Sequence, residues 1–105
     1  MKVLFICNQG ENRSKTAEHL FKDKFETRSA GLYNNLVKKS DMEWADLVIV
    51  MEDHQRKTIS ERFPELYLKK RIISLNILDV YYYNQPSLIK ILNEKIIEAT
   101  HQTVS

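Results

Sequence analysis

The sequence has few of the residues that cross-link or interrupt a chain. Its 105 residues include one cysteine, two glycines and two prolines. A single cysteine excludes an internal disulfide and agrees with a reducing, cytoplasmic setting. No repeat, low-complexity tract or interdomain linker is visible. The length therefore predicts a single domain, residues 1–105, with one modest core.

Long apolar runs and an excess of one charge are also missing. No apolar run approaches the ~18 residues of a membrane span, and the opening MKVLFIC is too short for a signal peptide. Sixteen basic against fourteen acidic side chains leave a net charge of +2, too weak to indicate nucleic acid binding. His19, His54 and His101 are scattered without metal-ligand spacing. We therefore expect no membrane, nucleic acid or metal partner.

What the chain does have is a dense polar segment directly after its first apolar run. Residues 3–14 read VLFICNQGENRS. The only cysteine, Cys7, lies in one seven-residue window with Gly10 and Arg13, and Ser14 follows. A lone cysteine is most often a small buried hydrophobe. Between a strand and a helix, however, this spacing predicts an anion-binding loop with a nucleophile at its base.

The chemistry of such a loop requires these residue types. A loop that closes over a phosphate directs successive backbone N–H groups inward, and the following helix adds its own free N–H groups. Gly10 can take the positive φ that a tight loop needs, and the Arg13 fork can hold two oxygens at once. These donors favour the reactive thiolate of Cys7. Ser14 could donate a hydrogen bond to it.

Apolar periodicity predicts alternating strands and helices along the whole chain. We expect strands at residues 2–7, 27–30, 46–51 and 71–75, and helices at 14–25, from Ser40 within a capping box, at 52–63 up to Pro64, and from Pro86. This order predicts an α/β fold: one three-layer domain with a four-stranded parallel sheet and helices on both faces. The Cys7 loop then lies at the carboxyl edge, where such sheets bind ligands.

Cleavage of a phosphate ester also needs an acid, because the departing oxygen must be protonated. Asp79 follows the last strand at the same edge as Cys7 and is the best candidate; the same carboxylate could then activate water. Tyr81, Tyr82 and Tyr83 beside it could wall the site for an aromatic substrate, although three consecutive tyrosines cannot all face one way. Glu52, at the end of another strand, is a weaker candidate.

These segments resemble, in order, the low-molecular-weight protein tyrosine phosphatases and their short bacterial and archaeal relatives. The resemblance covers CNQGENRS with KTAEHLF after it, RSAG at 28–31, EWADLVIVMEDHQ at 43–55 and ISLNILDVYYY at 73–83. It implies a phosphatase-like fold and a phosphomonoester hydrolase that works through a phosphocysteine, without a cofactor. It assigns catalysis to Cys7, Arg13, Ser14 and Asp79, and substrate contacts to Asn8, Gln9, Gly10, Glu11, Asn12, Tyr81 and Tyr82.

The sequence also departs from the family pattern. Gln9 and Gly10 stand where the family has glycine and then asparagine, Asn12 replaces a frequent second cysteine, and Lys15 and Val80 replace prolines. The chain is shorter than typical members between Gly31 and Asp46, the region that helps to wall the family's pocket. We therefore expect a more open site.

Two other functions remain open at this point. A cysteine phosphocarrier of the sugar phosphotransferase type has a similar size and loop, but that class typically lacks counterparts of Arg13 and Asp79. A non-catalytic phosphate-binding or regulatory protein would not need to retain nucleophile, arginine, serine and acid together. An arsenate reductase of this fold would need further cysteines. The predicted partner is a phosphorylated protein or a small phosphomonoester, and the chain is expected to be a monomer or weak dimer.

Overall fold

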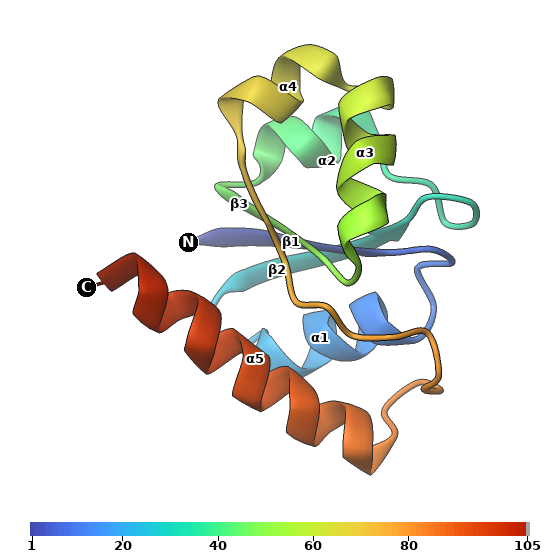
Figure 1. Cartoon of the computed structure of the whole chain (residues 1–105), viewed down its shortest axis with the longest axis vertical. Helices are drawn as coiled ribbons and strands as arrows, with labels where there is room; N and C mark the ends of the chain where they lie inside the picture. The colour runs from blue at the N-terminus through green and yellow to red at the C-terminus, as the bar shows by residue number, and fades with distance from the viewer. Residues whose placement is uncertain (105) are drawn as a thin grey trace.

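A computed structural model of the chain describes residues 1–104, with side chains up to Ala99. One parallel sheet runs through its centre (Figure 1). Its strands are β1 (Lys2–Cys7), β2 (Glu26–Gly31), β3 (Leu47–Val50) and β4 (Arg71–Ser74), in the order β2-β1-β3-β4. The predicted four-stranded parallel sheet is confirmed. Within the described residues, no helix combines the length and apolar character that crossing a membrane requires.

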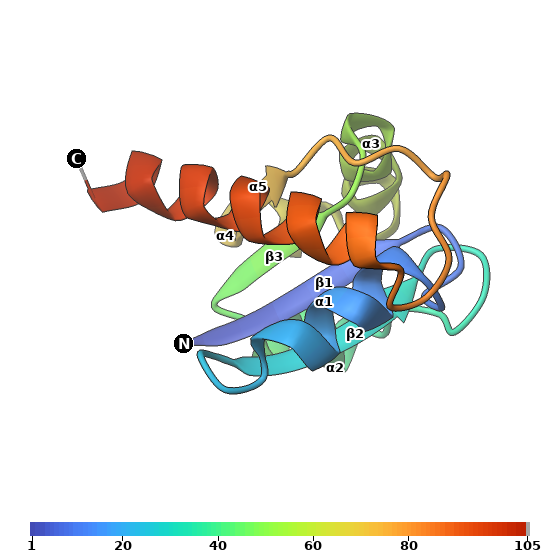
Figure 2. The same cartoon turned by 90° about the horizontal axis from the view of Figure 1, so that it is seen from below.

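Helices cover both faces of the sheet, as the strand and helix order predicts. In Figure 1, α1 (Arg13–Phe21) and α5 (Pro86–Val104) lie below the sheet, and Figure 2 shows them side by side. On the other face lie α2 (Lys39–Trp44), α3 (Asp53–Arg62) and α4 (Pro64–Lys69). The sheet is therefore the middle layer of three.

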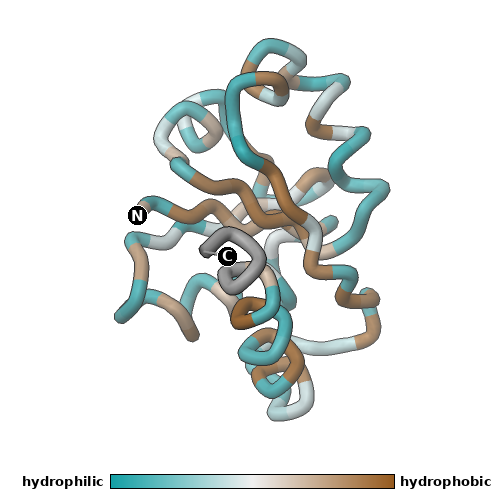
Figure 3. Tube along the Cα trace, turned by 60° about the vertical axis from the view of Figure 1, so that its left-hand side comes forward, coloured by the Kyte–Doolittle hydropathy of each residue, from teal (hydrophilic) through white to brown (hydrophobic). Residues whose placement is uncertain are grey.

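Each face of β1 supplies one of two apolar clusters. Val3 and Phe5 face α1 and α5, where Phe5 stacks on Phe21 with 6.0 Å between ring centroids. Leu4 and Ile6 face α2 and α3. Because both faces of a central parallel strand are buried, its sequence is continuously apolar instead of alternating. Figure 3 shows the apolar segments gathered in these central strands.

Two helix boundaries differ from the prediction. The helix expected at residues 14–25 ends at Phe21, whose carbonyl accepts hydrogen bonds from the N–H groups of Lys24 and Phe25 at 2.9 and 3.0 Å. The chain turns there, and Phe25 still reaches the core. The capping box expected from Ser40 is also wrong. Lys38 is the N-cap of α2, and its N–H donates to the Asp41 carboxylate at 3.0 Å.

Pro64 begins a helix as well as following one. Its missing N–H ends α3, as the sequence predicts, but it occupies the first turn of α4, a helix that the sequence analysis did not anticipate. Proline is favoured at that position because the first N–H groups of a helix have no partner within the helix. Leu66 and Tyr67 of α4 pack against the apolar cluster that α2 and α3 cover.

Candidate active site

The segment between β1 and α1 forms a tight loop at the carboxyl edge of the sheet (Figure 1). Gly10 takes a φ of +68°, the left-handed conformation that the sequence predicts for it. Its N–H donates to Cys7 Sγ at 3.2 Å, and Ser14 Oγ lies 3.1 Å from the same sulfur. Cys7 is buried. The loop therefore closes around the sulfur at its base.

Arg13, the first residue of α1, is the most enclosed cation of the site, with 1% of its side chain exposed. Nη1 donates to the Ile77 carbonyl at 2.6 Å and to the carboxylate of Glu52. Nη2 lies 3.6 Å from Asp79 Oδ1. Nε–H, in contrast, is buried and has no partner among the described residues. Because buried donors are normally hydrogen-bonded, an unpaired one suggests that its partner is a ligand. This N–H can therefore bind an anion in the loop.

Glu52 is the charge partner of Arg13, although the sequence analysis ranked it only as a weaker candidate. It caps the N-terminus of α3, and His54 Nε2 lies 2.8 Å from its second oxygen. Partial burial raises the pKa of Glu52, but the hydrogen bonds and the charges of Arg13 and His54 together outweigh that effect and hold the pKa below its usual range. Glu52 is therefore ionised and holds Arg13 by charge as well as by hydrogen bonding.

Gln55 is a further site residue that the sequence analysis missed. It is fully buried, and its side-chain oxygen accepts hydrogen bonds from the N–H groups of Met51 and Glu52, both at 2.9 Å. Its Nε2 donates to Asn8 Oδ1 at 2.8 Å. One amide thus joins the Cys7 loop to the start of α3. The available signal was a glutamine three residues after Glu52, the spacing of a capping box.

Three predicted loop residues are held by neighbours outside the loop or by the following helix. The Gln9 carbonyl accepts a hydrogen bond from Asn35 Nδ2 at 3.0 Å, and the exposed Glu11 carboxylate accepts one from Asn34 Nδ2 at 2.8 Å. The Asn12 carbonyl accepts the N–H of Thr16 at 2.9 Å, which begins α1. The loop is therefore fixed before any ligand arrives.

The segment between β4 and α5 brings Asp79 to the site, but the two predicted tyrosines, Tyr81 and Tyr82, differ in burial. Asp79 is 52% exposed and lies beside Arg13. The segment is anchored to α1 where the Asn84 N–H donates to Thr16 Oγ1 at 2.8 Å. Tyr81 packs against the apolar cluster, whereas Tyr82 is 65% exposed. One of the two predicted tyrosines therefore lies against the core and the other in solvent.

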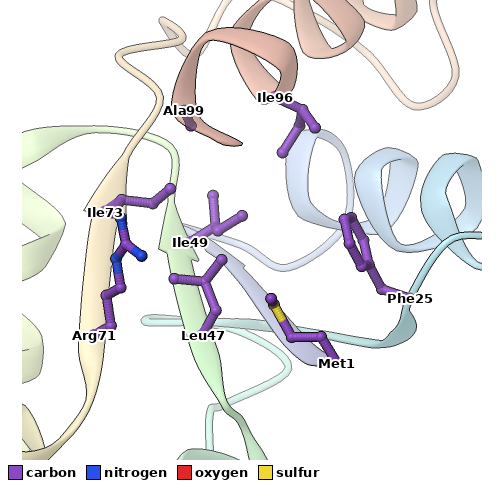
Figure 4. Close-up of a pocket in the computed structure, with 8 residues that line it drawn as sticks. All are labelled: Met1, Phe25, Leu47, Ile49, Arg71, Ile73, Ile96 and Ala99. Atoms are coloured by element: carbon purple, nitrogen blue, oxygen red, sulfur yellow. The ribbon is translucent and has the colours of Figure 1, made fainter. Parts of the chain in front are cut away.

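The far edge of the sheet holds an apolar cavity instead of reactive groups (Figure 4). Its volume is about 50 Å³, and its lining residues are Met1, Phe25, Leu47, Ile49, Arg71, Ile73, Ile96 and Ala99. No cluster of three or more possible metal ligands occurs among the described side chains, which do not include that of His101. The described side chains that could take part in a reaction lie instead at the carboxyl edge of the sheet.

No protein-family model and no curated protein sequence matches the chain. Solved structures do match. One is the YwlE arginine phosphatase from Geobacillus stearothermophilus, with a TM-score of 0.65 and 21% identity over 96% of each chain. The low molecular weight protein tyrosine phosphatase from T. tengcongensis gives a TM-score of 0.74 and 21% identity over 94% of this chain and 99% of that chain. SP-PTP, a low molecular weight protein tyrosine phosphatase from Streptococcus pyogenes, gives 0.77 and 16% over 99% and 93%. The chain thus has the fold of the low-molecular-weight phosphatases.

Proposed function

We propose that the protein is a cysteine-dependent phosphomonoester hydrolase of the protein tyrosine phosphatase type, acting through a phosphocysteine. One arrangement carries this proposal. The buried Cys7 sulfur lies at the base of a closed loop, 3.2 Å from the Gly10 nitrogen, and the buried Arg13 keeps an unpaired Nε–H. A nucleophile that lies beside a backbone N–H donor and a guanidinium with an unpaired N–H suits a reaction in which negative charge develops on phosphoryl oxygens.

In the first step the Cys7 thiolate attacks phosphorus in line with the leaving oxygen. The sulfur–phosphorus bond forms as the phosphorus–oxygen bond breaks, and Asp79 gives its proton to the departing oxygen. Backbone N–H groups of residues 8–13 and the Arg13 guanidinium hold the other phosphoryl oxygens. The position of Asp79 supports this role, because its carboxylate is half-exposed and lies 3.6 Å from Arg13 Nη2, within reach of the oxygen that leaves a phosphoryl group held by Arg13.

In the second step the Asp79 carboxylate takes a proton from water, and the resulting nucleophile attacks the phosphocysteine. The sulfur–phosphorus bond breaks, inorganic phosphate leaves and Cys7 returns as the thiolate. Ser14 Oγ, 3.1 Å from the sulfur, supports this step by hydrogen bonding to the departing thiolate. The side chains of the chain supply the nucleophile, the acid and the base, so the proposed mechanism requires no cofactor.

The proposed substrate is a phosphorylated protein or a small phosphomonoester. Structures with this fold carry names for two chemistries, arginine phosphatase and tyrosine phosphatase. Tyr82 is exposed beside Asp79 and can wall an aromatic leaving group, which favours the aryl ester. We expect Asn8, Gln9, Glu11 and Asn12 to take part through their backbone N–H groups. The side chains of Asn8 and Glu11 are already hydrogen-bonded to Gln55 and Asn34.

Hydrolysis of a generic aryl phosphate in a chelating buffer tests the proposal. We expect turnover by the reduced wild type, none by Cys7→Ser, and a strong loss in Asp79→Ala. Asp53→Asn is the matched control, because this exposed carboxylate begins α3 and contacts only Arg56, at 4.0 Å, among the described ion pairs. Absence of turnover by folded, reduced wild type would overturn the proposal for aryl esters.

A further inference from the structure

His54 extends the polar contacts of the site from the buried Arg13 to the protein surface. Arg13 Nη1 donates to one oxygen of the Glu52 carboxylate, and His54 Nε2 lies 2.8 Å from the other. The exposed fraction of these side chains rises outward, from 1% for Arg13 through 20% for Glu52 to 55% for His54. Among the described residues, Glu52 is the only hydrogen-bond partner of the His54 ring. Any influence of His54 on the reaction must therefore pass through Glu52.

The orientation of the Arg13 guanidinium depends on the groups that hold its Nη1. That nitrogen donates to Glu52 and to the Ile77 carbonyl, which fixes one corner of the guanidinium. Nε–H has no partner among the described residues, and Nη2 lies 3.6 Å from Asp79 Oδ1, beyond hydrogen-bond distance. Nε and Nη2 together form the edge that can bind two oxygens of one phosphoryl group. A displacement of Glu52 would therefore turn this edge away from the Cys7 loop.

The contact between His54 and Glu52 differs from an ordinary ion pair at the surface. Such pairs usually contribute little, because two long side chains have to be immobilised. Here Arg13 already holds one carboxylate oxygen, and the Glu52 main chain is fixed where its N–H donates to Gln55 Oε1 at 2.9 Å. Because an ionised carboxylate can only accept, His54 Nε2 is the donor. The ring therefore has only the last rotation of the carboxylate to prevent.

We propose that His54 is a positioning residue for phosphoryl binding. It fixes the Glu52 carboxylate, and Glu52 in turn directs the Nε and Nη2 edge of Arg13 into the Cys7 loop. This proposal rests on the proposed hydrolase activity and adds a residue to it. In this role His54 contacts neither the phosphoryl group nor the leaving group. It should therefore affect every ligand that Arg13 binds, including inorganic phosphate, which has no leaving group.

Two substitutions of different length test the contact. In His54→Gln the amide nitrogen is as many bonds from the backbone as the imidazole Nε2, so it can still donate to Glu52. In His54→Asn it is one bond nearer to the backbone and falls short. We expect His54→Asn to weaken binding of inorganic phosphate and to lower kcat/KM for a small aryl phosphate by about fivefold each, the order of one hydrogen bond at a partly exposed site. His54→Gln should stay close to the wild type in both.

The same pair of variants separates positioning from helix stability. Both place an uncharged amide in the first turn of α3, so their free energies of unfolding in urea should agree while their phosphate affinities differ. Glu52→Ala provides the second control, because it removes the acceptor. In that background His54→Gln and His54→Asn should bind phosphate equally, as expected for two residues that act as one unit.

The two proposals fail in different ways, and calorimetric titration with inorganic phosphate distinguishes them. Equal phosphate affinity in the wild type, His54→Gln and His54→Asn would overturn the positioning role and leave the hydrolase intact. Equal losses in both variants would also overturn it, because the contact with Glu52 would then not be the cause. Absence of turnover by the wild type would overturn the hydrolase, whereas the three phosphate affinities would still decide the role of His54. A folded wild type that does not bind phosphate would overturn both.

Discussion

Gly10 and Gly31, the two glycines of the chain, lie directly against each other. A Cβ on Gly10 would come 2.7 Å from the Gly31 nitrogen, and a Cβ on Gly31 would come 2.7 Å from the Gly10 nitrogen. Gly10 also needs its positive φ, whereas Gly31 is required only by this close approach. The end of β2 therefore determines whether the Cys7 loop can close.

Gly31→Ala should destabilise the protein and disturb the loop together. The added methyl would lie 2.0 Å from the Asn34 carbonyl oxygen and 2.6 Å from the Gln9 carbonyl carbon, both backbone atoms that cannot rotate away. We expect the free energy of unfolding to fall by about 1–3 kcal/mol, with a larger proportional loss of aryl phosphatase activity. Urea unfolding and steady-state kinetics measure the two effects. Ser29→Ala, which adds no atom two residues earlier in β2, is the control; equal behaviour of the two variants would contradict the packing argument.

Glu52→Gln tests whether the charge of Glu52 positions Arg13. The amide keeps the size of the side chain but removes the negative charge that faces the guanidinium. We expect kcat/KM to fall about tenfold, the value of one charge-assisted hydrogen bond. Because Glu52 acts through Arg13 and does not touch the phosphoryl group, the affinity for inorganic phosphate should fall in parallel. Asp53→Asn changes charge at the next residue and should leave both quantities unchanged.

The same carboxylate should make stability depend on pH on the acid side. The pKa of Glu52 is lower in the folded protein than in the unfolded chain, so its contribution is complete above the unfolded value and is lost as the pH falls through the folded value. The unfolding free energies of wild type and Glu52→Gln should therefore converge as the pH decreases below about 4.3, the usual glutamate value. Urea titrations across this range measure the difference. A constant difference would show that the charge of Glu52 does not contribute.

The sequence was informative where one local property determines the structure. The central strands β1 and β3 are identifiable because strands buried on both faces have to be continuously apolar. Gly10 is identifiable because a tight loop before a helix needs a positive φ, and the structure gives it one. Arg13 follows from the spacing to Cys7. Each of these inferences depends on residues within one short window, so no knowledge of the tertiary arrangement is needed.

The features that were missed depend on partners far away in the sequence. Arg13 and Glu52 are separated by 39 residues, and Asn8 and Gln55 by 47. The predicted parallel sheet puts the end of β3 at the same edge as the Cys7 loop, but only the pairing of β3 with β1 makes the two segments neighbours. The second role of Pro64, at the start of α4, was missed for a related reason, because only the packing of α4 on the apolar cluster shows that a helix follows.

Gln55 should couple stability and catalysis through its single hydrogen bond to Asn8. Gln55→Leu fills similar space but leaves the N–H group of Glu52 and the side chain of Asn8 without their partner. The N–H group of Met51 loses one of its two acceptors and keeps the Ile6 carbonyl at 3.1 Å. Each buried group left unpaired costs about 1–3 kcal/mol, so we expect a large decrease in the free energy of unfolding. Asn8→Ala should cost less, because it removes only one bond. A double-mutant cycle over Asn8→Ala and Gln55→Leu then isolates that bond from the other two. If the bond positions the loop, the cycle shows a coupling in kcat/KM as well as in stability, whereas additive effects on kcat/KM would restrict Gln55 to holding the start of α3.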